Sequence, residues 1–398
     1  MRINGMLRFL LSIAICCLAS NAHAKRGDLL KLQKVQALKV ADLKRSRNRI
    51  FPNMKIPDPR NGVVVYKVNY ETIDLDGAAT IASGALVIPD SKSRGHVLPL
   101  LSYQHGTALN REDVPSRINV EGAVVAITFG GLGYVIAEPD YLGEGDNTGI
   151  HPYHHADSEA SASIDMLRAV RKAAVQLGIV LGDELFLAGY SQGGHATMAL
   201  HQSIERDYSD EFKVTASAPM SGAYDLSHTT LSGVIKDPTK NSVVEVSFIL
   251  LTMNKIYHLY SSLDQVLDPK YSTILPSLFD GTHDWDDISS RLPPTPRELG
   301  KPAFVNELIS DSGNELITAL EKNDNYNWKP VAPVRMTYSG GDHDVPPENA
   351  LLAFRYMKAL GAPVEVVKVS DVFSHFEAVG PSFEQEIQWF ETLRAAVL

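Results

Sequence analysis

Cysteine is nearly absent from this sequence of 398 residues, which contains only Cys16 and Cys17. Both lie in residues 1–24, a segment with the pattern of a secretory leader that is removed on export. The chain expected to remain would have no thiol, which excludes disulfides, cysteine nucleophiles and cysteine-bound metals. A chain of about 370 residues can be stabilised by its hydrophobic core alone.

Positive charge and nucleotide-binding motifs are also scarce. The sequence has 37 Lys and Arg against 47 Asp and Glu, a net charge of −10, and loss of the leader with its two arginines would make it −12. An acidic chain of this kind is a poor partner for nucleic acid. Because neither G-x-G-x-x-G nor G-x-x-x-x-G-K-[ST] occurs, we expect no nucleotide cofactor. We expect no other cofactor and no metal.

The one long apolar run lies in the predicted leader. Arg2 and Arg8 precede the run FLLSIAICCLAS, which is too short to span a bilayer. Ala22-His23-Ala24 fits the A-x-A cleavage rule. The alternative is an uncleaved anchor. The segment predicts export to the periplasm or the medium.

Residues 25–60 form a basic segment after the leader. Residues 25–50 contain nine Lys and Arg against Asp28 and Asp42, a net charge of +7. The apolar positions of this stretch are loosely spaced as in a helix: Leu29, Leu32, Val35, Leu38 and Leu43. We therefore expect a helical N-terminal segment packed on the core, with a membrane-surface arm as the alternative.

The rest of the chain alternates between short apolar runs and helical stretches. A hairpin is expected around the Asp74–Gly77 turn, followed by buried runs such as VLPLLSYQHG and ELFLAG. This alternation predicts an α/β fold with a mostly parallel sheet. The rhythm breaks at residues 226–328 and resumes at 329, so we expect a core of residues 61–225 and 329–398 with a helical cap inserted between them.

Ser191 lies in the sequence LAGYSQGGHATMAL, which contains G-x-S-x-G. A strand is expected to end at Gly189, and a helix is expected to begin just past Gly193. Small residues are needed on such a tight turn, which exposes the serine Oγ above the sheet. The motif alone is common, but its position between a buried strand and a helix favours a nucleophile.

A nucleophilic serine needs a base and an orienting acid, which in the α/β-hydrolase arrangement follow it in the order Ser, Asp or Glu, His. The later strand ends offer Asp342 and His375, 33 residues apart. We favour Asp342 because it directly follows a Gly-Gly pair at a strand end. Asp344 stays open as the alternative acid, although a helix-capping role is expected for it.

Two backbone N–H groups are expected to form an oxyanion hole. Gln192, directly after the serine, supplies one. Thr107, in the loop after the strand LPLLSYQ, supplies the other, with Gly106 as the alternative.

Other polar residues near these motifs are expected to be structural. No acid is evident that would orient His195, so it is not expected to be the base. His151, His154 and His155 are crowded before a helix that Asp157 is expected to cap, which argues against a metal site. Asp140 and Asp146 precede the serine, against the expected order.

The chain resembles the secretory lipases and their bacterial relatives among the α/β-hydrolases. The resemblance covers most of residues 95–225 and 330–398 and is carried by the following motifs: GYSQGG, YQHGT, EPDYLGEG, HPYHHADSEASASIDMLRA, APMSGAYDL, GGDHDVPPENA and SHFEA. It implies an ester hydrolase in which Ser191, Asp342 and His375 form a triad under a helical cap. The chain departs from the fungal-type members in lacking their disulfides.

These observations predict an exported serine hydrolase that acts on lipid esters or short-chain esters. Its partners would be the ester substrate and, transiently, a lipid interface. A peptidase of the prolyl-oligopeptidase type would use the same triad order, but no propeller-like repeat precedes the domain. A non-enzymatic binding protein on this scaffold would more typically lack one of the three residues.

Overall fold

The computed structural model describes residues 25–90, 96–310 and 313–397. The predicted leader lies outside these ranges. Within them, no helix has both the length and the apolar character needed to cross a bilayer.

A nine-stranded sheet forms the centre of the molecule, with strand order β1-β2-β3-β5-β4-β6-β7-β8-β9. β1, β2, β3 and β5 pair antiparallel, whereas β5, β4, β6, β7, β8 and β9 pair parallel. The strands are β1 (Leu29–Leu38), β2 (Val63–Ile73), β3 (Ala79–Pro89), β4 (Val97–Gln104), β5 (Val135–Pro139), β6 (Val180–Tyr190), β7 (Val214–Met220), β8 (Val334–Ser339) and β9 (Val364–Ser370). The predicted α/β class is confirmed.

Helices cover both faces of the sheet. On one face α3 (Ala156–Leu177), α4 (Gln192–Asp207) and α13 (Glu348–Ala359) pack on the strands. On the other face lie α1 (Val40–Ile50), α2 (Val120–Val125), the π-helix η3 (Ala126–Gly130) and α14 (Val379–Val397). The central strands are buried from both sides, which explains their near-continuous apolar sequences. A short 3₁₀ turn, η2, spans Pro115–Arg117.

The predicted hairpin is present as β2 and β3. Its register runs without a break from Val63 opposite Pro89 to Ile73 opposite Ala79. In the turn, Asp74 Oδ1 accepts hydrogen bonds from the N–H groups of Asp76 and Ala78. Gly77 has φ +79°, a conformation that favours glycine.

The prediction of a helical segment at residues 25–60 is wrong for its first half. Residues Leu29–Leu38 form the edge strand β1, and only Val40–Ile50 are helical. β1 pairs antiparallel with β2, whose edge would otherwise present a row of unpaired backbone groups. Tertiary pairing therefore overrides a weak helical spacing. The lysines of β1 also suit an exposed sheet edge, because charge there opposes pairing with another chain.

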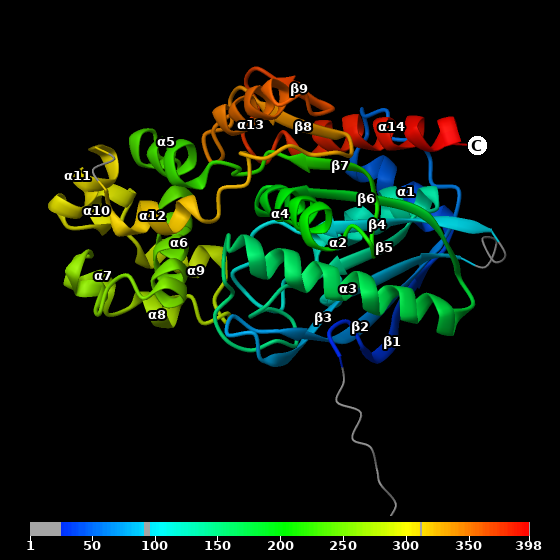
Figure 1. The fold of residues 1–398 in the computed structure, drawn as a ribbon, viewed down its shortest axis with the longest axis horizontal. Coiled ribbons are helices and arrows are strands. Elements are labelled where there is room, and N and C mark those ends of the chain that lie inside the picture. The colour runs from blue at the N-terminus through cyan, green and yellow to red at the C-terminus, as the bar shows by residue number, and fades with distance from the viewer. Residues whose placement is uncertain (1–24, 91–95, 311–312, 398) are drawn as a thin grey trace, which may run out of the picture.

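The inserted segment between β7 and β8 is helical and lies beyond one end of the sheet (Figure 1). It has its own apolar core, built mainly around α6. Its elements are η4 (Leu226–Thr230), α5 (Leu231–Lys236), α6 (Ser242–Tyr257), η5 (Leu263–Gln265), α7 (Pro269–Ser272), α8 (Leu275–Leu278), α9 (Trp285–Arg291), α10 (Pro296–Leu299), α11 (Pro302–Ser310) and α12 (Glu315–Glu321). We call this segment the cap.

Candidate active site

Ser191 occupies the tight turn between β6 and α4. Its backbone angles, φ +61° and ψ −124°, lie in a region that non-glycine residues rarely adopt. The helix begins at the next residue, Gln192, so Ser191 lies at the N-terminus of α4. The free N–H groups and the dipole at this end favour negative charge.

Glycines on both sides of Ser191 make this turn sterically feasible. A Cβ atom at Gly193 would lie 1.9 Å from the carbonyl oxygen of Gln104, and one at Gly189 would lie 2.5 Å from the same oxygen. Both distances are shorter than any real Cβ contact. The predicted need for small residues at the turn therefore has a specific cause, the close approach of the β4 end to the start of α4.

Parallel pairing brings the relevant strand ends to one edge of the sheet. Gln104 of β4 is paired with Gly189 of β6, and Ser339 of β8 with Ser370 of β9. The loops that follow these strands therefore emerge together. They contribute Thr107, Ser191, Asp342 and His375.

His375 and Asp342 form a buried pair. Nδ1 of His375 lies 2.7 Å from Oδ2 of Asp342. The other carboxylate oxygen, Oδ1, accepts hydrogen bonds from the N–H groups of Asp344 and Val345 at 3.1 and 2.8 Å. Burial opposes the charged imidazolium, but Asp342 outweighs it through its charge and hydrogen bond, so the pKa of His375 is raised above its ordinary value.

Asp344, the alternative acid, is engaged elsewhere. Its carboxylate accepts hydrogen bonds from the Thr239 hydroxyl and, at 2.9 Å, from the Asn241 amide. Both partners belong to the cap. The expected capping role is wrong, because α13 begins only at Glu348 and Asp344 lies outside its first turn.

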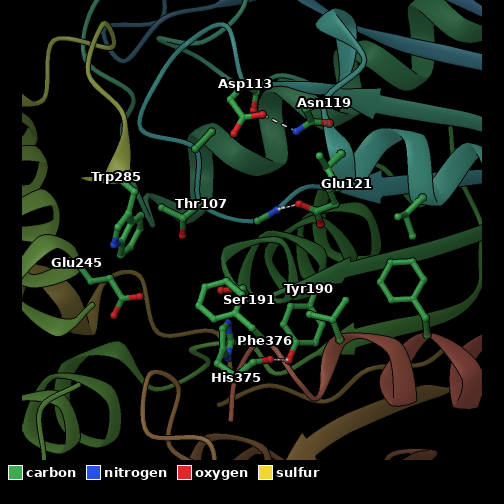
Figure 2. Close-up of a pocket in the computed structure, with 16 residues that line it drawn as sticks. Thr107, Asp113, Asn119, Glu121, Tyr190, Ser191, Glu245, Trp285, His375 and Phe376 are labelled. Atoms are coloured by element: carbon green, nitrogen blue, oxygen red, sulfur yellow. Dashed lines mark hydrogen bonds between the residues drawn. The ribbon is translucent and has the colours of Figure 1, made fainter. Parts of the chain in front are cut away.

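Ser191 and His375 line one cavity of about 390 Å³ at the carboxyl end of the sheet (Figure 2). Asp342 contacts Nδ1 of His375 and does not line this cavity. The walls of the cavity come from the core and from the cap. The other residues that line it are Gly106, Thr107, Ala108, Asp113, Asn119, Val120, Glu121, Val124, Tyr190, Glu245, Trp285, Phe376, Val379 and Phe383. The Tyr190 hydroxyl donates to the carbonyl of His375 at 2.5 Å, which ties the histidine loop to the strand that carries the serine.

The loop after β4 passes close to Ser191. A Cβ atom at Gly106 would lie 3.7 Å from Cβ of Ser191. The N–H of Gly106 already donates to Oε2 of Glu121 at 3.0 Å, which argues against Gly106 as the oxyanion donor. Of the two alternatives, Thr107 stays the predicted donor; its hydroxyl lies 3.0 Å from that of Tyr153.

The prediction that no acid orients His195 is wrong, because this histidine has a carboxylate partner. Its Nδ1 lies 2.7 Å from Oε2 of Glu159, and its Nε2 lies 2.9 Å from the carbonyl oxygen of Asn323. Glu159 comes from α3, which packs against α4, so a local sequence window could not reveal it. With both ring nitrogens bonded and the ring fully buried, His195 joins α3, α4 and the end of the cap.

The same network holds Gln192, the residue that follows Ser191. The Gln192 amide nitrogen lies 2.6 Å from Nε2 of His151 and 2.9 Å from Oε1 of Glu159. His151 in turn contacts the Leu142 carbonyl at 2.8 Å. These bonds fix the Gln192 side chain and with it the start of α4.

The remaining histidines of the cluster have separate environments. His155 precedes α3, so Asp157 lies in the first turn of the helix and does not cap it. Burial and the neighbouring histidines lower the pKa of His154 well below its ordinary value, which keeps it neutral. Potential ligand atoms of His154, Glu159 and His195 lie within 4.8 Å of one another, but the bonds of His195 already account for its ring nitrogens.

Asp140 and Asp146, the two aspartates that precede Ser191, form hydrogen bonds within and around the loop after β5. Asp140 accepts from the Ser83 hydroxyl and the Ser116 N–H at 2.6 and 2.9 Å. Asp146 is held by Lys67, Asn69 and Arg117. Neither contacts His375.

Glu121, Glu245 and Trp285 are among the cavity residues that the sequence analysis did not single out. Glu121 accepts from the Tyr103 hydroxyl as well as from Gly106, so it anchors the loop beside Ser191. Glu245 and Trp285 belong to the cap helices α6 and α9, where each reads as an ordinary helix residue. No local motif marks any of the three.

Comparison with known proteins places the fold in a group of hydrolases. No protein-family model matches the sequence, and no curated protein sequence matches it. Among solved structures, a Legionella pneumophila protein assigned as a hydrolase is 30% identical, with a TM-score of 0.86 over 92% of this chain and 98% of its own. The rice cell wall degrading esterase LipA from Xanthomonas oryzae is 27% identical, with a TM-score of 0.85 over 93% of this chain and 100% of its own.

Candida antarctica lipase A has the same fold at 17% identity, with a TM-score of 0.64 over 91% of this chain and 83% of its own. The similarity to the Legionella and Xanthomonas proteins extends over nearly the whole of each chain. Together with the sheet topology, it agrees with the resemblance seen in the sequence. The chain belongs to the lipase/esterase family of α/β-hydrolases and is a carboxylic ester hydrolase.

Proposed function

We propose that the chain is an exported serine hydrolase that cleaves carboxylic esters through an acyl-enzyme on Ser191. One observation carries the proposal: a serine in a strained turn shares a cavity with a histidine whose Nδ1 is held by a buried aspartate. The export part of the proposal depends on the leader pattern of residues 1–24 alone.

In the first half-reaction the Ser191 hydroxyl attacks the ester carbonyl carbon, and its proton passes to Nε2 of His375. Asp342 holds the imidazole with Nε2 free for this step and stabilises the positive charge that develops. The N–H groups of Thr107 and Gln192 bind the oxyanion. The C–O bond of the ester then breaks, and His375 gives the proton to the departing alcohol.

In the second half-reaction water replaces the alcohol. His375 takes a proton from the water, the hydroxide adds to the acyl carbon, and the bond to Ser191 Oγ breaks as the proton returns to the serine. The free acid leaves. The sequence of steps needs no cofactor.

On one side of Ser191 the cavity walls are apolar and suit the acyl chain of an ester. Val120, Val124, Val379 and Phe383 of α2 and α14 are apolar. Trp285 and Glu245 of the cap lie on the other side (Figure 2). We assign the apolar side to the acyl group and the cap side to the alcohol. Exposed Val120 and Phe376 at the cavity would suit transient contact with a lipid interface.

The test is hydrolysis of p-nitrophenyl esters from acetyl to palmitoyl, alongside a prolyl anilide. Ser191→Ala should abolish ester turnover, whereas Ser203→Ala on the same helix should not. Ester turnover that survives Ser191→Ala contradicts the proposal. Faster cleavage of the anilide than of the esters would favour a peptidase instead.

A further inference from the structure

Glu245 brings a carboxylate from the cap into the cavity that contains Ser191. It lies in the first turn of α6, a helix whose other residues in this stretch are mostly apolar and buried. Figure 2 shows its carboxylate directed into the open part of the cavity. Among the residues that the structure describes, none forms a hydrogen bond or ion pair with this carboxylate. Glu245 is partly buried, and a carboxylate withdrawn from water without a partner is costly to the fold.

The charges around Glu245 are of the same sign. Asp113 and Glu121 also line the cavity, and Asp344 and Asp342 act on Glu245 through their charge. Of the described residues that line the cavity, none is a lysine or an arginine. Among the described residues that act on Glu245, only His375 opposes these charges, and it is already paired with Asp342. Burial, first of all, and Asp344 raise the pKa of Glu245 to about 8.

Trp285 supplies a second element of recognition from the cap. It is the first residue of α9, which packs against α6, and its indole lines the same cavity. The face of an indole attracts cations through its quadrupole, more strongly where water is excluded. A carboxylate and an indole in one cavity are the groups that bind ammonium ions.

We propose that Glu245 and Trp285 form a cation-selective subsite for the alcohol part of the ester, so that the enzyme prefers esters of ammonium-bearing alcohols to neutral esters of the same shape. This inference depends on the proposed serine-esterase function, because it assigns the alcohol to the cap side of Ser191. A bound ammonium ion supplies the charge partner that Glu245 lacks. Its positive charge also favours ionisation of Glu245.

The experiment compares two substrates of nearly equal shape, butyrylcholine and 3,3-dimethylbutyl butyrate, in which carbon replaces the charged nitrogen. The quantity measured is the ratio of their kcat/KM values, choline ester over neutral ester. For the wild-type chain without its leader we expect a ratio of about 10 or more. Glu245→Gln should lower it about tenfold, and Trp285→Leu should lower it by a smaller factor.

The pH dependence of the same ratio gives an independent readout. Protonation of His375 slows both substrates and cancels in the ratio. Ionisation of Glu245 affects mainly the choline ester, so the ratio should rise as the pH increases through about 8. In Glu245→Gln this rise should disappear.

Asp286→Asn is the matched control, since Asp286 is an exposed acid next to Trp285 that does not line this cavity. It should leave the ratio unchanged. Thermal melting shows whether each variant is folded.

Three outcomes would overturn the cation subsite. The first is a wild-type ratio near one at every pH, and the second is an equal loss of kcat/KM for both substrates in Glu245→Gln. The third is seen with glycerol monobutyrate as an additional substrate: a loss of kcat/KM in Glu245→Gln for this ester alone would assign the subsite to a hydroxyl-rich alcohol. Failure of the proposed function is a separate result: the neutral ester would not be cleaved, or Ser191→Ala would still cleave it.

Discussion

Nδ1 of His195 lies 2.7 Å from Oε2 of Glu159, the same separation that joins Nδ1 of His375 to Oδ2 of Asp342. The two pairs differ at the second ring nitrogen. Nε2 of His195 faces the carbonyl oxygen of Asn323 at 2.9 Å, whereas the ring of His375 lines the cavity with Ser191. A histidine–carboxylate pair four residues after the serine is therefore structural, and the distant pair is available for catalysis.

Exchange of each histidine for alanine should separate these roles. His375→Ala should lower kcat by at least about 10³-fold because the serine loses its base. His195→Ala should keep substantial activity but lower the free energy of unfolding by about 3 kcal/mol, because the buried Glu159 carboxylate loses its partner. Ester kinetics and thermal melting measure the two effects. A larger loss of kcat in His195→Ala than in His375→Ala would reverse the assignment.

The two aspartates at the end of β8 should differ in the same way. Asp342→Asn keeps the shape of the side chain but no longer stabilises the imidazolium of His375, so kcat should fall by about 10⁴-fold. Asp344→Asn alters bonds to the cap at Thr239 and Asn241 and should change kcat far less. Steady-state kinetics of both variants on one p-nitrophenyl ester decide the matter. Equal losses would mean that the carboxylates act as a unit.

The acid limb of the pH profile should report on His375. The base must be neutral to accept the serine proton, so kcat/KM rises as the pH passes upward through its pKa in the free enzyme. Because Asp342 raises that pKa, the midpoint should lie above the ordinary value of 6.5. Measurement of kcat/KM from about pH 5 to about pH 9 gives the midpoint. A midpoint below 6.5 would show that Asp342 does not stabilise the imidazolium.

Glu121 should act as a positioning residue for the oxyanion loop. Glu121→Ala removes the acceptor for the Gly106 N–H and frees the loop that carries Thr107. We expect kcat to fall by about 10²-fold with a smaller change in KM, since oxyanion binding matters most in the transition state. Glu121→Gln, whose amide oxygen can still accept from Gly106, should recover most of the activity. A variant pair with equal loss would show that charge, rather than loop position, is responsible.

Gly193→Ala tests the sterics of the turn. The added Cβ would lie 1.9 Å from the Gln104 carbonyl oxygen, so β4 and α4 must separate and the protein should be strongly destabilised. Gly182→Ala is the control, because the closest atom to its Cβ would be in the exposed side chain of Val97, at 3.0 Å, and the nearest backbone atom, the carbonyl oxygen of Leu98, would lie at 3.7 Å. Melting temperatures of the two variants make the comparison. A stable Gly193→Ala protein would mean that the turn is less crowded than described.

The parts of the molecule that could be predicted are those that chain order determines. In an α/β fold the carboxyl ends of parallel strands meet at one edge of the sheet, so the sequence alone predicts that the motifs around Ser191, Asp342 and His375 share one site. The hairpin at residues 63–89 was predictable from its turn chemistry.

What failed depends on contacts between distant segments. β1 is a strand because β2 offers it an edge, and His195 has an acid because α3 packs beside α4. Glu245 lies near Ser191 only because the cap packs over the cavity. None of these contacts leaves a periodic or local signal in the sequence.

The central claim, an acyl-enzyme on Ser191, is tested most directly by mass spectrometry of the protein quenched during turnover of a slow p-nitrophenyl ester. The account predicts a mass increase of one acyl group, located by proteolysis on the peptide that contains Ser191 and absent from Ser191→Ala. His375→Ala should form the adduct far more slowly. An adduct on another residue, or rapid turnover with no adduct and no burst of p-nitrophenol, would contradict the mechanism.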